Sequence, residues 1–69
     1  MGTVARVTEI SSTSEKSFED AIAVGVDRAD ETLRKIRAGW VKDQEVRVVD
    51  GRVVEYQVNM LVTFVLDDE

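Results

Sequence analysis

The feature that most constrains this chain is an Asp-Gly pair, Asp50-Gly51, between two runs rich in β-branched and aromatic residues. Such a pair favours a two-residue type I′ turn, because that turn needs a positive φ at both central residues. The sequence therefore predicts one long hairpin from Trp40 to Leu66. The turn sets the register of this hairpin by placing Val49 opposite Arg52.

The register assigns the side chains of the hairpin to two faces. If the pairing continues without a break, Gln44 lies opposite Gln57 and Trp40 lies opposite Leu61. Because side chains alternate along a strand, Trp40 and Gln57 then share one face. The third strand places its large apolar residues on the other face: Val54, Tyr56, Val58, Met60, Val62, Phe64 and Leu66. One face is thus the predicted core, and the single tryptophan lies on the opposite face.

Part of the second strand does not follow this pattern. Asp43, Glu45 and Arg47 fall on the face that should cover the core. Two explanations remain open: the hairpin extends beyond the core, or a β-bulge shifts the pairing by one residue. A bulge would also move Trp40 relative to Gln57.

The first half of the chain predicts a short strand followed by a helix. Residues 4–10 are rich in β-branched residues, and the hydroxyl-rich run at 11–14 predicts a loop. Ser14 or Ser17 would cap a helix of roughly residues 14–37. The apolar residues of this helix recur every three or four positions, as one buried stripe requires: Phe18, Ala21, Ile22, Gly25, Val26, Ala29, Leu33 and Ile36.

Two further features support this helix. Gly25 costs about 1 kcal/mol relative to alanine in a helix, so we expect it to pack closely against the sheet. Acidic residues lie near the predicted start, and Arg34, Lys35 and Arg37 lie near the predicted end, as the helix dipole favours. The order strand, helix, strand, strand predicts an α+β fold, in which a three-stranded antiparallel sheet wraps around one long helix. We expect residues 1–69 to form a single domain, ending in an acidic tail at 67–69.

The size of the chain limits how it can be stabilised. A chain of 69 residues is near the lower limit for one self-sufficient core. It has no cysteine for disulfides or zinc-thiolate sites, and no histidine, the commonest metal ligand and general base. We therefore expect oligomerisation through the face opposite the core, which would carry the apolar residues Trp40, Val46, Val48, Leu61 and Val65.

The net charge of −5 argues against nucleic acid or an anionic membrane as a partner. The run Arg34-Lys35-Ile36-Arg37 is the one local cluster suited to a phosphate. No apolar run is long enough to span a membrane, and no signal-peptide core is present, so we expect a cytoplasmic location. The sequence also contains no nucleophile–base pair, metal-ligand cluster or phosphate-binding glycine motif, so we expect no enzyme activity and no metal site.

The order and spacing of several segments resemble the dodecin family. The resemblance covers nearly the whole chain and rests on Val4-Ala5-Arg6-Val7-Thr8-Glu9-Ile10, Ser12-Thr13-Ser14, Thr32-Leu33-Arg34, Glu55-Tyr56-Gln57-Val58 and Val62-Thr63-Phe64-Val65-Leu66-Asp67. It implies a homododecamer that binds flavins such as FMN or riboflavin, and that stores, sequesters and quenches them rather than acting as an enzyme.

The resemblance also implies a binding site. In this family, paired flavin rings stack between symmetry-related tryptophans, and a glutamine binds the polar edge of the ring. Gln57 matches that glutamine. The usual tryptophan position holds Ala38, and Trp40 lies two residues later, on the same face and about 6–7 Å along the strand. A position that is often basic holds Glu45. Trp40 and Gln57 are therefore the predicted flavin-binding residues.

Simpler roles for these residues remain open. Trp40 would then pack in a subunit interface, and Gln57 would form a cross-strand hydrogen bond with Gln44. An assembly of the same shape would in that case bind no flavin, and would serve as a scaffold or bind another small molecule or a cation.

Overall fold

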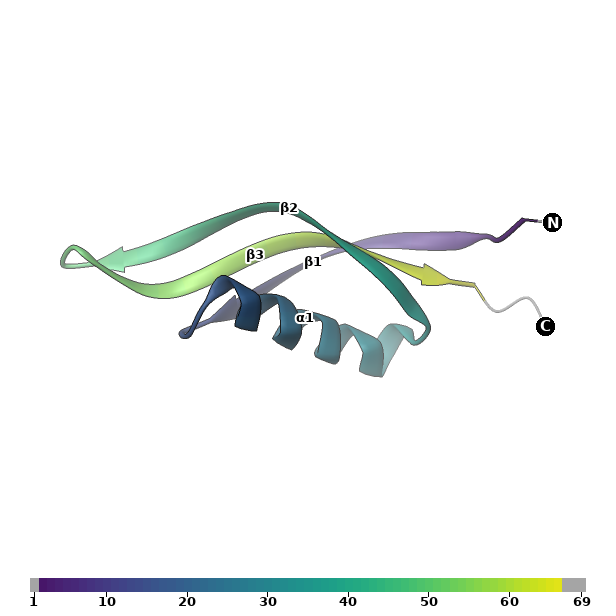
Figure 1. The fold of residues 1–69 in the computed structure, drawn as a ribbon, viewed down its shortest axis with the longest axis horizontal. Coiled ribbons are helices and arrows are strands. Elements are labelled where there is room, and N and C mark those ends of the chain that lie inside the picture. Colours follow the sequence, from purple (N-terminus) through teal and green to yellow (C-terminus); the bar gives the residue numbers. More distant parts are fainter. Residues whose placement is uncertain (1, 67–69) are drawn as a thin grey trace.

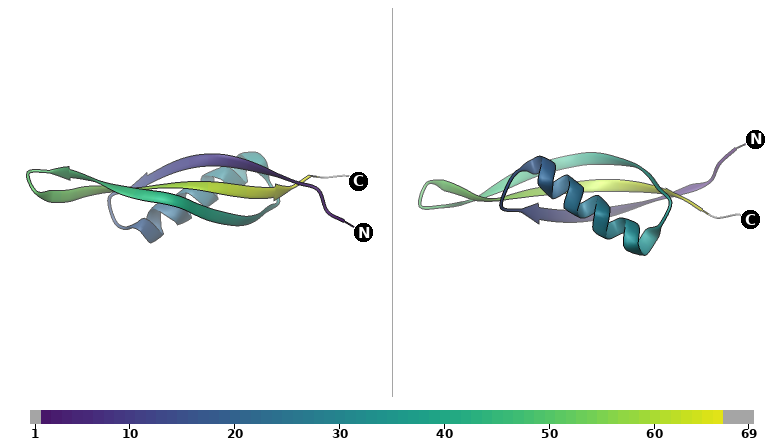
Figure 2. Two further views of the ribbon diagram at one scale, coloured as in Figure 1. Left: turned by 90° about the horizontal axis from the view of Figure 1, so that it is seen from above. Right: turned by 60° about the horizontal axis from the view of Figure 1, so that its bottom comes forward.

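The computed structural model describes residues 2–66, and the expected acidic tail at 67–69 lies outside them. The elements follow in the order β1 (Ala5–Ser14), α1 (Phe18–Leu33), β2 (Ile36–Val49) and β3 (Arg52–Val65). All three strands form one antiparallel sheet with the order β1-β3-β2. The helix α1 crosses one face of this sheet (Figures 1 and 2). The predicted α+β arrangement is confirmed.

The turn at Asp50-Gly51 forms as the sequence predicts. Asp50 has a φ of 52° and Gly51 a φ of 77°, and Val49 lies opposite Arg52. The hairpin extends well past the start of α1, so that its tip has no helix beneath it (Figure 1). The molecule is consequently long and thin, measuring 53 × 19 × 13 Å.

Register shifts interrupt the pairing of β2 with β3. They lie between Arg47 and Val48, between Val41 and Asp43, and between Ile36 and Ala38. The shift between Arg47 and Val48 has one extra residue in β3, whereas the shift between Val41 and Asp43 has the extra residue Lys42 in β2. The two shifts therefore cancel.

These shifts decide which register predictions hold. Between the first two shifts, Gln57 lies opposite Glu45, and the predicted pairing with Gln44 is wrong. Beyond the second shift, β2 and β3 return to the register that the Asp50-Gly51 turn predicts. Trp40 therefore lies opposite Leu61, as predicted.

The shifted segment explains the misplaced charges of β2. Asp43 lies opposite Asn59 and Glu45 opposite Gln57, so both carboxylates share the face of Asn59 and Gln57, away from the helix. The same shift places Val46 opposite Tyr56, on the helix side of the sheet. The prediction that Val46 shares a face with Trp40 is therefore wrong. Both explanations left open by the sequence are therefore true, since the hairpin also projects beyond the helix.

The start of the helix is capped by Ser17, whose Oγ accepts a hydrogen bond from the Asp20 backbone N–H at 2.9 Å. The other candidate cap, Ser14, ends β1 instead, and its Oγ donates to Asp20 Oδ2 at 2.6 Å. The predicted loop at 11–14 is thus wrong. These residues continue β1, because Ser12 and Ser14 pair with β3 opposite Val58 and Tyr56.

The helix ends earlier than predicted. Its last residue is Leu33, and Arg34 and Lys35 have φ values of 61° and 49°. The Arg34 N–H donates to the Asp30 carbonyl oxygen at 3.2 Å, which closes the last turn. The basic residues therefore lie outside the helix rather than in its last turn, because Ile36 already pairs with Phe64 in the sheet.

The core lies between α1 and the middle of β3. Val58, Met60 and Val62 are fully buried, together with Ala21 of the helix. A Cβ on Gly25 would lie 2.7 Å from Met60 Cε and 3.0 Å from Ser12 Cβ. Ser12 is itself fixed, because its Oγ donates to the Ala21 carbonyl oxygen at 2.8 Å. The predicted close approach of Gly25 to the sheet is confirmed.

The protomer is more open than an ordinary small protein. It exposes 5310 Å², whereas a compact monomer of 7.7 kDa exposes about 4300 Å². Its radius of gyration is 14.2 Å, against about 11 Å for a compact chain of this length. Every residue of β2 after Ile36 is exposed. The second strand thus contributes little to the core of a single protomer.

We expect Gly25→Val to lower the free energy of unfolding by about 1–3 kcal/mol, because the added methyl groups overfill the contact with Met60 and Ser12. Urea denaturation at a fixed protein concentration measures this change. The matched control is Ala23→Val on the exposed side of α1, where only helix propensity changes, by less than about 0.7 kcal/mol. Equal losses in the two variants would contradict tight packing at Gly25.

Candidate functional site

The candidate site lies on the sheet face directed away from α1, here called the outer face. Antiparallel partners share a face, and alternate residues of one strand share a face. The strand pairing therefore defines the outer face by the following residues: Glu9, Ser11 and Thr13 of β1, Trp40, Asp43 and Glu45 of β2, and Gln57, Asn59 and Leu61 of β3. Both predicted site residues belong to it.

Trp40 is the most exposed large hydrophobic residue of this face. Its exposed fraction is 69%, and it lies opposite Leu61. Ala38 lies opposite Thr63, one strand repeat further from Gln57, so the indole keeps the same face at a different position along the sheet. An exposed indole offers a broad flat surface for stacking. Trp40 and Gln57 are separated by four residues of β3, or about 13 Å.

A chain of hydrogen bonds runs across the outer face from β2 to β3. Asn59 Nδ2 donates to Asp43 Oδ1 at 2.6 Å, and Gln57 Nε2 donates to Asn59 Oδ1 at 3.2 Å. Gln57 is half-buried and bonds to Asn59 rather than to Gln44. Sequence reasoning missed Asn59, and it placed Asp43 on the core side unless a bulge shifted the pairing. The bulge at Lys42 is what brings Asp43 and Asn59 onto this face together.

The charges of the outer face sum to a negative value. Lys42 Nζ lies 3.3 Å from Glu9 Oε2, so this cation is already neutralised by a carboxylate across the sheet. Within residues 2–66, the lysine and arginine ion pairs do not involve Asp43 or Glu45. Glu45 lies directly opposite Gln57. The surface beside Gln57 is therefore acidic, whereas a site for a phosphate would be basic.

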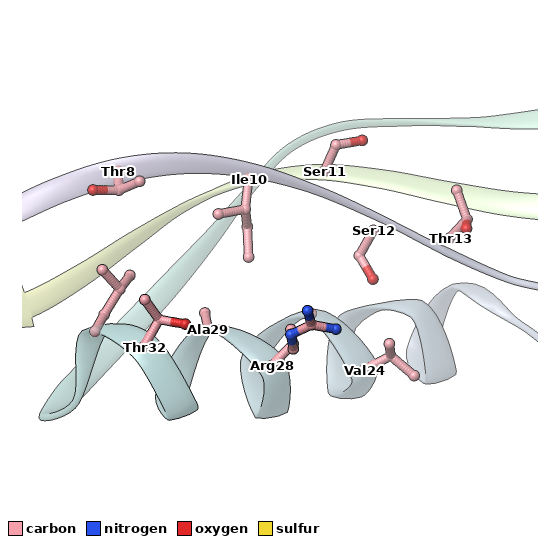
Figure 3. Close-up of a pocket in the computed structure, with 11 residues that line it drawn as sticks. Thr8, Ile10, Ser11, Ser12, Thr13, Val24, Arg28, Ala29 and Thr32 are labelled. Atoms are coloured by element: carbon pink, nitrogen blue, oxygen red, sulfur yellow. The ribbon is translucent and has the colours of Figure 1, made fainter.

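A separate groove of about 530 Å³ lies between β1 and α1 (Figure 3). Small aliphatic and hydroxyl side chains line it, and Arg28 is its one charged lining residue. Arg28 Nε lies 3.9 Å from Glu31 Oε1. The groove contains no aromatic residue and lies on the helix side of β1, apart from Trp40 and Gln57. It lacks the flat surface that stacking requires.

Other candidate sites are weaker. Residues 2–66 contain no group of three or more His, Cys, Asp or Glu side chains arranged to hold a metal ion. The basic run lies where α1 connects to β2: Arg34 and Lys35 form the connection, Arg37 falls within a register shift of β2, and Lys35 and Arg37 line one open pocket. In the part of the chain that the structure describes, no helix is both long and apolar enough to cross a membrane.

Comparison with known proteins gives consistent matches over the full chain. The Dodecin family model matches residues 4–67. A dodecin from Thermus thermophilus is 39% identical over 70 residues, covering 99% of each chain. The structure of a dodecin from Streptomyces davaonensis is 34% identical and superposes with a TM-score of 0.93, covering 99% of this chain and 100% of the other.

A further structural relative has a different ligand. It is a calcium dodecin from Mycobacterium tuberculosis, described as a calcium-chelating immunodominant antigen with a novel calcium-binding site. It is 31% identical and superposes with a TM-score of 0.81, covering 97% of this chain and 96% of the other.

Proposed function

Because this chain belongs to the dodecin family, we propose that it assembles as a homododecamer and binds a flavin of the FMN or riboflavin type. Its role is to store and sequester the flavin and to quench its excited state. The observation that carries this proposal is Trp40, a 69% exposed indole on the same sheet face as Gln57.

The indole of Trp40 supplies the stacking surface. When bound, a flavin supplies a planar, electron-poor ring with a polar edge and an excited state that accepts an electron. Stacking of a planar heterocycle on an aromatic side chain contributes roughly 1–3 kcal/mol. A two-fold axis between subunits brings a second Trp40 to the same site, which doubles the stacking surface. Electron donation by the indole in contact then quenches flavin fluorescence.

Gln57 supplies the polar contact of the site. Its side chain offers both a carbonyl acceptor and N–H donors, which match the alternating carbonyl and N–H groups at the edge of a flavin ring. Its half-buried position in the sheet limits its motion. Gln57 therefore fixes the orientation of a ring that Trp40 binds by stacking.

The open shape of the protomer supports assembly. The chain exposes 5310 Å², about 1000 Å² more than expected for its mass. Apolar residues form much of this surface, and they include Val7, Val24, Val41, Val46, Val48, Val49, Val53 and Val54. Burial of these residues between subunits would supply the hydrophobic stabilisation that one small core lacks.

The charge of the outer face favours a neutral flavin over a phosphorylated one. Glu45 lies opposite Gln57, and Asp43 lies on the same face. A phosphate near two carboxylates is repelled, by about 1 kcal/mol per pair of charges at 4 Å in water. We therefore expect riboflavin to bind more tightly than FMN.

A second candidate function is an assembly of the same shape that binds no flavin and serves as a scaffold or holds a cation or another small molecule. The calcium dodecin of Mycobacterium tuberculosis favours this alternative. Asp43 and Glu45 give this chain oxygen ligands on one face, and a calcium ion would need further oxygens from neighbouring subunits.

Trp40→Ala should weaken riboflavin binding by about fivefold to 150-fold, since it removes about 1–3 kcal/mol of stacking. Titration of riboflavin fluorescence measures the affinity, and light scattering checks that the assembly stays intact. The matched control is Trp40→Phe, which keeps a smaller aromatic ring and should lose less affinity. Unchanged binding by Trp40→Ala would assign Trp40 to packing instead.

Glu45→Lys should raise the affinity for FMN relative to riboflavin by up to about thirtyfold, because at 4 Å it replaces about 1 kcal/mol of repulsion by about 1 kcal/mol of attraction. The gain should shrink at high ionic strength, since salt screens exposed charges. Asp27→Lys makes the same charge change on the exposed side of α1, away from the outer face, and should leave the ratio unchanged. An FMN preference in the unmodified protein would contradict this account of the charge.

A further inference from the structure

We propose that Asp43 and Asn59 act as positioning residues that orient the amide of Gln57, so that the site selects ligands with a ring N–H next to a carbonyl, as at the imide edge of a flavin. This inference rests on the proposed flavin-binding function and specifies the ligand class of the same site. It is carried by the two hydrogen bonds from Gln57 to Asn59 and from Asn59 to Asp43. We call this pair of bonds the amide relay.

The direction of the amide relay is set at Asp43. An ionised carboxylate accepts hydrogen bonds and donates none. Asn59 must therefore present its NH₂ group to Asp43, and the separation of 2.6 Å fits a charge-assisted bond. Because the Asn59 NH₂ group donates to Asp43, the Asn59 carbonyl oxygen points towards Gln57.

The same logic then fixes Gln57. Because Asn59 offers Oδ1 to its neighbour, Gln57 must donate from Nε2, as it does at 3.2 Å. One N–H of Gln57 is used by the relay, while its other N–H and its carbonyl oxygen stay available. In the reversed orientation, the Gln57 carbonyl oxygen would accept a hydrogen bond from Asn59, and only the N–H donors of Gln57 would remain for a ligand. The charge of Asp43 thus preserves a donor–acceptor pair on Gln57.

The backbone positions this relay through the bulge at Lys42. Without the bulge, the alternation of β2 would direct Asp43 to the helix side of the sheet. The shift between Val41 and Asp43 instead places the carboxylate directly opposite Asn59. Gln57 and Asn59 are alternate residues of β3 and share a face. Register shifts of this kind are known to re-aim side chains next to functional sites.

The available edge of Gln57 defines the ligand chemistry. Its carbonyl oxygen accepts from an imide N–H, and its remaining N–H donates to an adjacent carbonyl of the same ring. A ring whose imide nitrogen is methylated gives that oxygen no donor. An unpaired polar group in a covered site is costly. The amide relay therefore predicts discrimination between riboflavin and its N3-methyl derivative.

The test compares the assembled protein with Asp43→Asn, because a carboxamide at position 43 no longer dictates the orientation of Asn59. We expect the wild-type protein to prefer riboflavin over N3-methylriboflavin, and Asp43→Asn to reduce this preference by about threefold to tenfold. Asn59→Leu, which removes the middle of the relay, should reduce it similarly. The matched control is Asp27→Asn, which makes the same chemical change on the exposed side of α1, away from the outer face, and should keep the preference.

A second readout needs no flavin. Exchange of the Gln57 side-chain NH₂ protons with water, measured by NMR, should accelerate in Asp43→Asn and stay unchanged in Asp27→Asn. Unchanged exchange, or unchanged preference in Asp43→Asn, would overturn the relay while leaving flavin binding intact. A wild-type protein that binds no flavin would overturn the proposed function instead, and the exchange measurement would then decide the relay by itself.

Discussion

The bulge at Lys42 turns the carboxylates of β2 away from the helix, and the rest of the outer face depends on it. Without that extra residue, Asp43 and Glu45 would face the helix side of the sheet, where covering a charge is costly. With it, they lie opposite Asn59 and Gln57. The opposite shift near Arg47 lets the hairpin close at its Asp50-Gly51 turn. Two small irregularities thus reconcile a charged strand with an apolar core.

The parts of the fold that obey local rules are predictable from the sequence. The Asp50-Gly51 turn, the helix stripe and the core side of β3 follow from backbone preference and periodicity, and Gly25 has the predicted contact with Met60. The run at 11–14 forms a strand despite its loop-like composition, because pairing with β3 outweighs local preference. The helix likewise ends at Leu33, because the residues beyond it join β2.

The candidate site was predictable to a smaller extent. Trp40 and Gln57 share a face as the sequence predicts, since the first two shifts cancel before Trp40 is reached. Asp43 and Asn59 could not be found in the same way, because no residue type marks the position of a bulge. Their hydrogen bond arises from pairing between segments sixteen residues apart. The role of Trp40 and Gln57 in binding stays a prediction.

The open shape of the chain connects the proposed assembly with the proposed flavin binding, because burial of the exposed apolar surface and of the exposed indole would stabilise both. Native mass spectrometry of the protein incubated with riboflavin tests this link most directly, because one spectrum counts both subunits and ligands. The account predicts a particle of about 92 kDa, twelve times the 7.7 kDa chain, carrying bound riboflavin. A twelve-subunit particle without riboflavin, or a monomer, would contradict it.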